Sequence, residues 1–216
     1  MNIEQLRKLA GREEIDYPFL MSALSNYAWP REKISNWLKS GELIRVKKGL
    51  YVFGSDVARS PYSKELLANL IYGPSAISLQ YALSYYGLIP ERVSVVTSIT
   101  PKRKKVFDSP VGRFTYQYLE AKKYAMGITF VVIDREQKIL MASLEKALCD
   151  HLHLNDKKIK FSQLSDVEAY LFSDLRADQD VLGSVKLKNL LALSHLYRDD
   201  RLLWLHNFIK QWKTAR

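Results

Sequence analysis

The sequence predicts a mixed fold of helices and strands, α/β in class (α+β), and three observations support this prediction. Apolar residues recur at helical spacing in the first forty residues, and a short hairpin pattern follows them. Between residues 92 and 141 the period changes to two, which is typical of strands. Helical periodicity then returns from residue 143 onward. This order indicates a small N-terminal unit followed by a larger mixed α/β domain with a helical C-terminal tail.

The composition indicates a globular protein that attracts polyanions. Of the 216 residues 47% are hydrophobic, and the formal net charge is +10. This surplus favours a nucleic acid as partner over a membrane surface, because no apolar run approaches the roughly 20 residues that a membrane-spanning helix needs. The first residues lack the basic start and apolar core of a secretion signal. Cys149 is the single cysteine, which excludes an internal disulfide, so we expect a reducing cytoplasm and no membrane partner.

The N-terminal stretch predicts two short helices. Ile3, Leu6 and Leu9 share one face of an amphipathic helix over residues 2–10. Asp16 is placed to cap a second helix whose apolar residues, among them Leu20, face inward.

Residues 30–53 carry the clearest local pattern. Pro30 suits the first position of a helix, Ile34 and Trp37 share its apolar face, and Gly41 ends it. Two short strands, residues 43–46 and 50–53, follow and are joined through a basic turn. Three helices followed by a tight basic hairpin are the layout of a winged helix-turn-helix domain, which we predict for residues 1–59.

Basic and polar side chains gather on the outer face of this predicted helix and hairpin. From Arg31 to Lys48 there are six basic residues against two acidic ones. Such side chains donate hydrogen bonds to phosphate oxygens and to base edges in the major groove. An ordinary solvated surface is the alternative, but a short hairpin does not need so many lysines and arginines. We therefore predict contacts with double-stranded DNA through Arg31, Lys33, Ser35, Asn36, Lys39, Arg45, Lys47 and Lys48.

A polar stretch over residues 54–63 predicts a linker, with a domain boundary near Ser60. The second domain, residues 60–216, begins with helices over residues 64–72 and from Ser75 or Ser78 to residue 87. Strands are expected over residues 92–100 and 114–118, over residues 128–133 as a strand buried on both faces, and over residues 139–141 after a turn at 134–138. Ser143 is placed to cap the next helix, and three more helices are expected near residues 165–175, 186–197 and 202–213.

A second basic surface is predicted at Lys102, Arg103, Lys104 and Lys105. Four consecutive basic residues are usually a solvated loop or strand end. They also suit a second phosphate contact or a docking surface for an acidic protein or RNA.

No motif indicates catalysis. Cys149, Asp150, His151 and His153 resemble a metal cluster, but His151 points away from the face shared by Cys149 and His153 on a helix. His195 and His206 have no neighbouring nucleophile or acid in a motif. Gly54 and Ser55 followed by Asp56 resemble the opening of a nucleotidyltransferase site, but the later carboxylate pair is missing. We expect no metal, no cofactor and no enzyme; the alternative is that residues 60–216 are an enzyme acting on nucleic acid or nucleotides.

Several motifs in a fixed order resemble the AbiEi antitoxins of type IV abortive-infection toxin–antitoxin systems. They are PREKI at 30–34, GELIRVKKGLY at 41–51, GPSAIS at 73–78, ALSYYGLIP at 82–90, TSIT at 97–100, GRF at 112–114 and ASLEKAL at 142–148. The resemblance covers residues 30 to about 150 and leaves out the helical tail. Leu144 stands where the family pattern has a proline, and since that proline only presets a helix start we expect little consequence.

The resemblance implies a bacterial protein whose N-terminal winged helix represses its own operon by binding inverted repeats in the promoter. It also implies a C-terminal antitoxin domain, residues 60–216, that helps to neutralise a nucleotidyltransferase-like toxin without forming a stable complex with it. The missing carboxylate pair agrees with this chain being the antitoxin.

Overall fold

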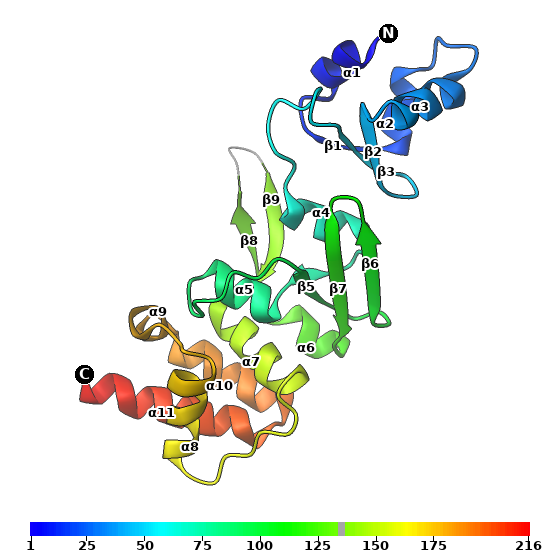
Figure 1. The fold of residues 1–216 in the computed structure, drawn as a ribbon. Helices are drawn as coiled ribbons and strands as arrows, with labels where there is room; N and C mark the ends of the chain where they lie inside the picture. Colours follow the sequence, from blue (N-terminus) through cyan, green and yellow to red (C-terminus); the bar gives the residue numbers. More distant parts are fainter. Residues whose placement is uncertain (134–136) are drawn as a thin grey trace.

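A computed structural model describes residues 1–133 and 137–216, so most of the predicted turn at 134–138 lies outside the described residues. The molecule is elongated (Figure 1). A small N-terminal unit lies at one end, a sheet occupies the middle, and helices form the other end. The predicted α/β class is confirmed, including the helical C-terminal part.

The N-terminal unit has the element order helix, strand, helix, helix, hairpin. Its elements are α1 (Ile3–Ala10), β1 (Glu14–Asp16), α2 (Tyr17–Ala23), α3 (Pro30–Lys39), β2 (Leu43–Lys47) and β3 (Leu50–Phe53), and its strands pair antiparallel in the order β1-β3-β2. The predicted capping is confirmed, because the Asp16 carboxylate accepts a hydrogen bond from the Phe19 amide and Pro30 opens α3. The sequence pattern did not predict β1, which is too short for a period of two to be visible.

One side of each helix builds the core of this unit. Leu6, Leu20 and Leu24 are fully buried, and Ile34 and Trp37 of α3 pack with them. Burying these side chains fixes the orientation of α3, so that its opposite face is turned to solvent.

A close backbone contact ties the end of the hairpin to the end of α3. The Gly54 amide donates to the carbonyl of Glu42 at 2.9 Å, and a Cβ at position 54 would lie only 2.0 Å from the carbonyl oxygen of Gly41. Gly54 is therefore required for packing, which accounts for the glycine in the Gly54-Ser55-Asp56 stretch without a catalytic role.

We expect Gly54→Ala to lower the free energy of unfolding by about 2–3 kcal/mol, because the added methyl group meets backbone that has little room to move. Gly183→Ala is the matched control, since a Cβ there meets no atom within 4 Å. Urea denaturation of the two variants measures the difference. Equal free energies of unfolding for the two variants would contradict the close contact at Gly54.

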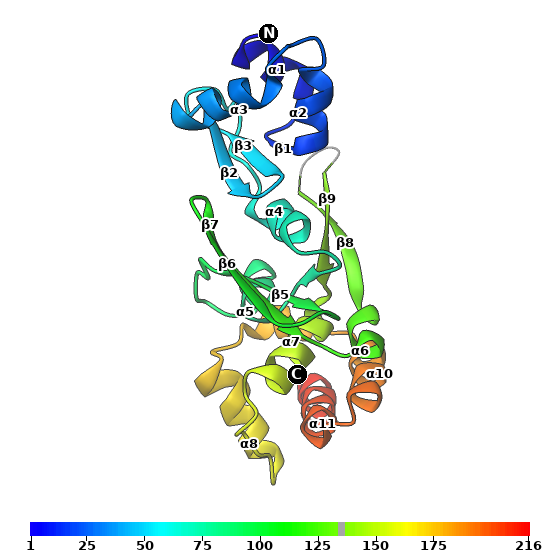
Figure 2. The same ribbon diagram turned by 90° about the vertical axis from the view of Figure 1, so that its right-hand side faces the viewer.

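The larger unit is built on a six-stranded sheet within the described residues. The order is β6 (Lys105–Ser109), β7 (Gly112–Tyr118), β5 (Val96–Thr100), β4 (Ala76–Ile77), β9 (Lys138–Ala142) and β8 (Ile128–Val132). The β5–β7 and β4–β9 pairs are parallel, and the other pairs are antiparallel. Helix α4 (Lys64–Ile71) lies between this sheet and the N-terminal unit, as Figures 1 and 2 show.

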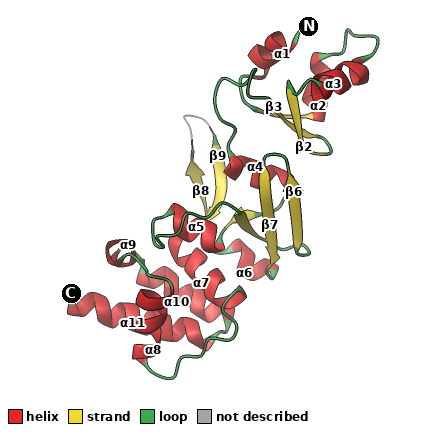
Figure 3. Ribbon diagram, viewed as in Figure 1, coloured by secondary structure: helices red, strands yellow, loops and turns green. Residues whose placement is uncertain are grey.

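The prediction that residues 128–133 form a strand buried on both faces is wrong. β8 pairs only with β9 and is therefore an edge strand (Figure 3). Phe130 is 69% exposed and Val132 is 58% exposed. An uninterrupted apolar run is typical of a central strand, but the sheet ends here and nothing in the described chain covers the outer side of these two residues.

Helices close the far side of the sheet and continue to the C-terminus. They are α5 (Leu79–Tyr85), α6 (Ala121–Ala125), α7 (Leu144–Leu154), α8 (Leu164–Ala169) with the π-helix η1 (Tyr170–Asp174), α9 (Gln179–Gly183), α10 (Leu187–Tyr197) and α11 (Asp200–Ala215). The cap predicted at Ser143 is confirmed, as are the three late helices. The short α6 and α9 were not predicted, because five residues do not display a helical period.

The two units are in contact along the predicted linker. Val46, Leu50 and Val52 of the hairpin pack into the core of the larger unit, which also contains Leu67 of α4. The carboxylates of Glu13 and Glu14 accept backbone hydrogen bonds from linker residues, including Ser63 N to Glu14 Oε1 at 2.7 Å. The hairpin therefore belongs to both cores, and the boundary near Ser60 remains a prediction.

No helix within residues 1–133 and 137–216 is both long enough and apolar enough to cross a membrane.

Candidate nucleic-acid interface

The outward face of α3 carries the predicted contact residues. Asn36 and Lys39 are exposed, and Ser35 is half-buried beside them. Glu32 lies on the same exposed face, and its acidic side chain reduces the positive charge there. Arg31 is exposed at the start of the helix, where its Nε donates to the Tyr17 hydroxyl at 3.2 Å.

Lys33 lies at the edge of this face rather than at its centre. Its ammonium group is 5.2 Å from the ring centroid of Tyr27 and 5.4 Å from that of Trp37, and the side chain is half-buried. These cation–π contacts hold the Lys33 charge against the helix side. Lys33 is therefore less free to reach a base edge than Asn36 or Lys39.

Two hairpin residues extend the exposed basic surface. The Arg45 guanidinium lies 5.9 Å from the ring centroid of Tyr51, and Lys48 is exposed at the turn next to Gly49, whose φ of +86° suits glycine. None of the ion pairs formed within the described parts of the chain uses a basic side chain of α3 or of the hairpin. The charges of Arg45 and Lys48 are thus available to an external anion.

Lys47 has internal partners, and its predicted contact with DNA stays a prediction. Its ammonium donates to the carbonyl oxygens of Leu70 at 3.0 Å and of Ile71 at 2.5 Å, at the C-terminal end of α4. These carbonyls lack partners within the helix, and the helix dipole attracts a cation there. Burial lowers the pKa of Lys47, and the nearby Lys105 adds to this effect. Lys47 therefore fastens the hairpin to the larger unit.

The second basic run adjoins the same helix end. Lys102 Nζ donates to the Gly73 carbonyl at 2.5 Å, and the ammonium groups of Lys102 and Lys105 both lie near the ring of Tyr72. Arg103 and Lys104 are exposed and, with Tyr118, line a groove of about 700 Å³. Two basic stretches that are far apart in the sequence therefore meet around the C-terminus of α4.

The residues of the suspected metal cluster have separate partners. Asp150 is fully buried in a hydrogen-bond network, His151 faces Asp156 at 3.2 Å, and His153 Nδ1 faces Asp199 Oδ2 at 2.9 Å. Cys149 is buried, and burial raises the pKa of its thiol well above the usual range. Within the part of the chain that the structure describes, no group of three or more His, Cys, Asp or Glu side chains is arranged to hold a metal ion.

The network around Asp150 is a feature that the sequence analysis missed. Ser78 Oγ donates to Asp150 Oδ2 at 2.6 Å, Lys146 Nζ donates to Asp150 Oδ1 at 2.6 Å, and the Tyr197 hydroxyl bonds to both charged groups. All four side chains are at most 1% exposed, so they cannot meet a substrate. The one feature of the sequence that indicates this network is the i,i+4 spacing of Lys146 and Asp150. Ion pairs with this spacing usually lie on exposed helix faces, so the spacing does not predict a buried pair.

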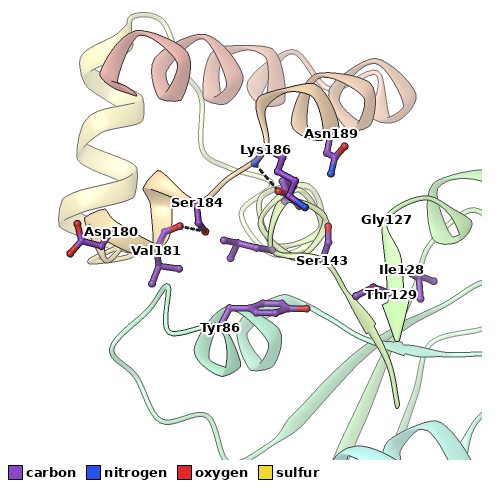
Figure 4. A pocket seen from close by; sticks show the side chains of 12 residues that line it. Tyr86, Gly127, Ile128, Thr129, Ser143, Asp180, Val181, Ser184, Lys186 and Asn189 are labelled. Carbon is purple, nitrogen blue, oxygen red and sulfur yellow. Dashed lines mark hydrogen bonds between the residues drawn. The ribbon is translucent and has the colours of Figure 1, made fainter. Parts of the chain in front are cut away.

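A further cavity of about 800 Å³ lies between α5, the β8 edge and the α9–α10 connection (Figure 4). Several of its polar groups already have partners: Glu145 Oε1 accepts from the Lys186 amide at 2.7 Å, and the Tyr86 hydroxyl donates to the Ala142 carbonyl at 2.9 Å. Burial raises the pKa of Tyr86 to about 12, so this hydroxyl is protonated near neutral pH. These two side chains are therefore engaged within the protein.

No protein-family model and no curated protein matches the sequence.

Proposed function

We propose that this chain is a winged-helix protein that binds double-stranded DNA, represses its own operon and acts as the antitoxin of a type IV toxin–antitoxin system. The observation that carries the DNA-binding part is the polar and basic outer face of α3, presented beside an exposed basic hairpin. A major groove about 12 Å wide admits an α-helix, and the order helix, strand, helix, helix, hairpin is that of winged-helix DNA-binding domains.

The side chains divide into two groups in this proposal. Ser35, Asn36 and Lys39 face base edges, while Arg31, Arg45 and Lys48 hold the phosphate backbone. Lys33 supports α3 from its side. The run from Lys102 to Lys105 supplies a second set of phosphate contacts, since it adjoins the hairpin through Lys47 and Tyr72.

The antitoxin part of the proposal rests on the resemblance in sequence motifs. It assigns to the larger unit a role in neutralising a nucleotidyltransferase-like toxin in the bacterial cytoplasm, without a stable complex. One winged helix covers about one half-site, so a promoter with inverted repeats takes two copies of the chain.

The experiment is a titration of the full chain against its own upstream promoter fragment and against an unrelated duplex of equal length, at two salt concentrations. We expect a preference of about a thousandfold or more for the promoter, as specific regulators show. Equal and strongly salt-dependent binding to both duplexes would refute sequence-specific repression. A separate experiment tests the antitoxin role. The chain is expressed in cells that also express the toxin encoded next to it, and the recovery of growth is measured.

Replacing the two hairpin lysines one at a time separates anchoring from DNA contact. Lys47→Ala is expected to lower the free energy of unfolding by about 1–2 kcal/mol, because it removes charge-assisted hydrogen bonds to two carbonyls. Lys48→Ala is expected to leave stability unchanged and to flatten the slope of log K against log salt by about 0.9, the effect of one phosphate contact. The reverse pattern would show that Lys47 is the DNA contact.

A further inference from the structure

Helices α6 and α10 lie in the part of the molecule away from α3 (Figure 2), and a third group of basic side chains gathers beside them. Helix α6, the end of α7 and the end of α10 surround a cavity of about 700 Å³. Basic side chains contribute most of its charged groups. Its lining includes Lys122, Lys123, His153, His195 and Arg198.

Two nitrogen groups are held close together at this cavity. Lys123 Nζ lies 3.5 Å from His153 Nε2, and the other ring nitrogen of His153 faces the Asp199 carboxylate at 2.9 Å. Asp199 thereby fixes the histidine ring with Nε2 directed toward the lysine. With Nδ1 donating to Asp199, Nε2 is the acceptor for the Lys123 ammonium, and the remaining hydrogens of this ammonium can bond the oxygens of an anion.

The wall behind these groups is rigid. The Tyr197 ring packs edge-on against the His153 ring, with 5.1 Å between the two ring centroids. The Lys123 ammonium lies 5.4 Å from the centroid of the Tyr197 ring. The Tyr197 hydroxyl is locked in the buried network with Lys146 and Asp150. A preorganised wall of this kind lowers the entropic cost of binding.

Carboxylates offset only part of the positive charge at the cavity. Asp199 accepts two hydrogen bonds from the Arg201 guanidinium, at 2.8 and 2.7 Å, so its charge is already paired. Among the described residues that line the cavity, Glu120 is the one carboxylate, and two lysines and an arginine oppose it. The site therefore has a surplus of cationic donors in a concave, partly enclosed space, where they attract an anion more strongly than on an open surface.

We propose that this cavity binds the phosphate group of a small phosphorylated molecule, with Lys123, oriented by His153, at its centre and Arg198 at its rim. A cavity of about 700 Å³ exceeds what a bare phosphate fills and falls within the size of small-molecule sites. The ligand is thus expected to carry further atoms, as a sugar phosphate or a nucleotide does. This proposal does not depend on DNA binding by α3.

The four histidines of the chain provide the readout and its control. His153 and His195 line the cavity, whereas His151 and His206 are buried outside it. The full chain is titrated with inorganic phosphate, ribose 5-phosphate and AMP at constant pH and ionic strength, and histidine ring resonances are followed by NMR. We expect saturable shifts of His153 and His195, with His151 and His206 unchanged.

Two substitutions test the assignment. Lys123→Gln removes a central charge and is expected to raise Kd about tenfold or more, the fold-change of a lost charge-assisted hydrogen bond. Arg198→Asn removes the rim charge without strain, because Arg198 has a φ of +53° and asparagine tolerates this left-handed conformation. Lys157→Gln, at an exposed lysine outside the cavity, is the control.

Each outcome has a defined meaning. Tighter binding of AMP or of ribose 5-phosphate than of inorganic phosphate, weakened by Lys123→Gln and Arg198→Asn but not by Lys157→Gln, supports the proposal and identifies the ligand source. Absence of shifts with all three probes overturns it. Shifts that are equal in all three variants would show only non-specific attraction to a basic protein and would also overturn it.

Discussion

Replacing Asp150 by Ala is expected to lower the free energy of unfolding by about 3–5 kcal/mol, since breaking a buried ion pair leaves a charge without compensation. Lys146 is 0% exposed and would retain its ammonium with no carboxylate beside it. Burial lowers the pKa of Lys146, while Asp150 acts in the opposite direction, so the carboxylate favours the charged form. The Ser78 and Tyr197 hydroxyls would also lose their common acceptor.

Urea denaturation at neutral pH measures this loss. Asp180→Ala is the control, because Asp180 is an exposed helix residue paired with Arg216 at the surface, and a change within about 0.5 kcal/mol is expected there. The double variant Lys146→Met and Asp150→Leu removes both charges and is expected to recover part of the stability. A loss below about 1 kcal/mol for Asp150→Ala would mean that the network contributes little to stability.

The second large effect is expected on DNA. Asn36→Ala together with Lys39→Ala should weaken binding to the promoter about a hundredfold, because an asparagine that contacts a base contributes about 1–3 kcal/mol of discrimination and a lysine adds a phosphate or base contact. Both side chains are exposed, so the fold should be unaffected. Fluorescence anisotropy measures the loss of affinity for the promoter and for an unrelated duplex.

The single variants distinguish the two contacts. Asn36→Ala should reduce affinity for the promoter only, whereas Lys39→Ala, if it contacts phosphate, should weaken binding to both duplexes. Lys188→Ala is the control for charge alone, because it removes an exposed lysine from α10, at the opposite end of the molecule from α3. An equal loss for Lys188→Ala and Lys39→Ala would show that net charge, not the face of α3, determines binding.

Local signals in the sequence were sufficient for most helices and for the hairpin. Pro30 and Gly41 delimit α3, Asp16 and Ser143 cap helices, and Gly49 closes the β2–β3 turn, because each of these residues acts within a few positions of itself. The same periodicity identified which face of α3 is buried and hence which residues are exposed for DNA. The sequence by itself thus determined the helices and the hairpin of the N-terminal unit and the candidate surface on them.

No local signal in the sequence predicts the contacts between distant segments. Lys47 meets the end of α4, Asp150 meets Ser78 and Tyr197, and the basic run from Lys102 adjoins the hairpin. Likewise, the apolar pattern of residues 128–133 does not reveal that the sheet ends at β8. Only the tertiary structure decided these features, because chain topology sets which neighbour a side chain meets, whereas capping and periodicity report only on residues nearby in the sequence.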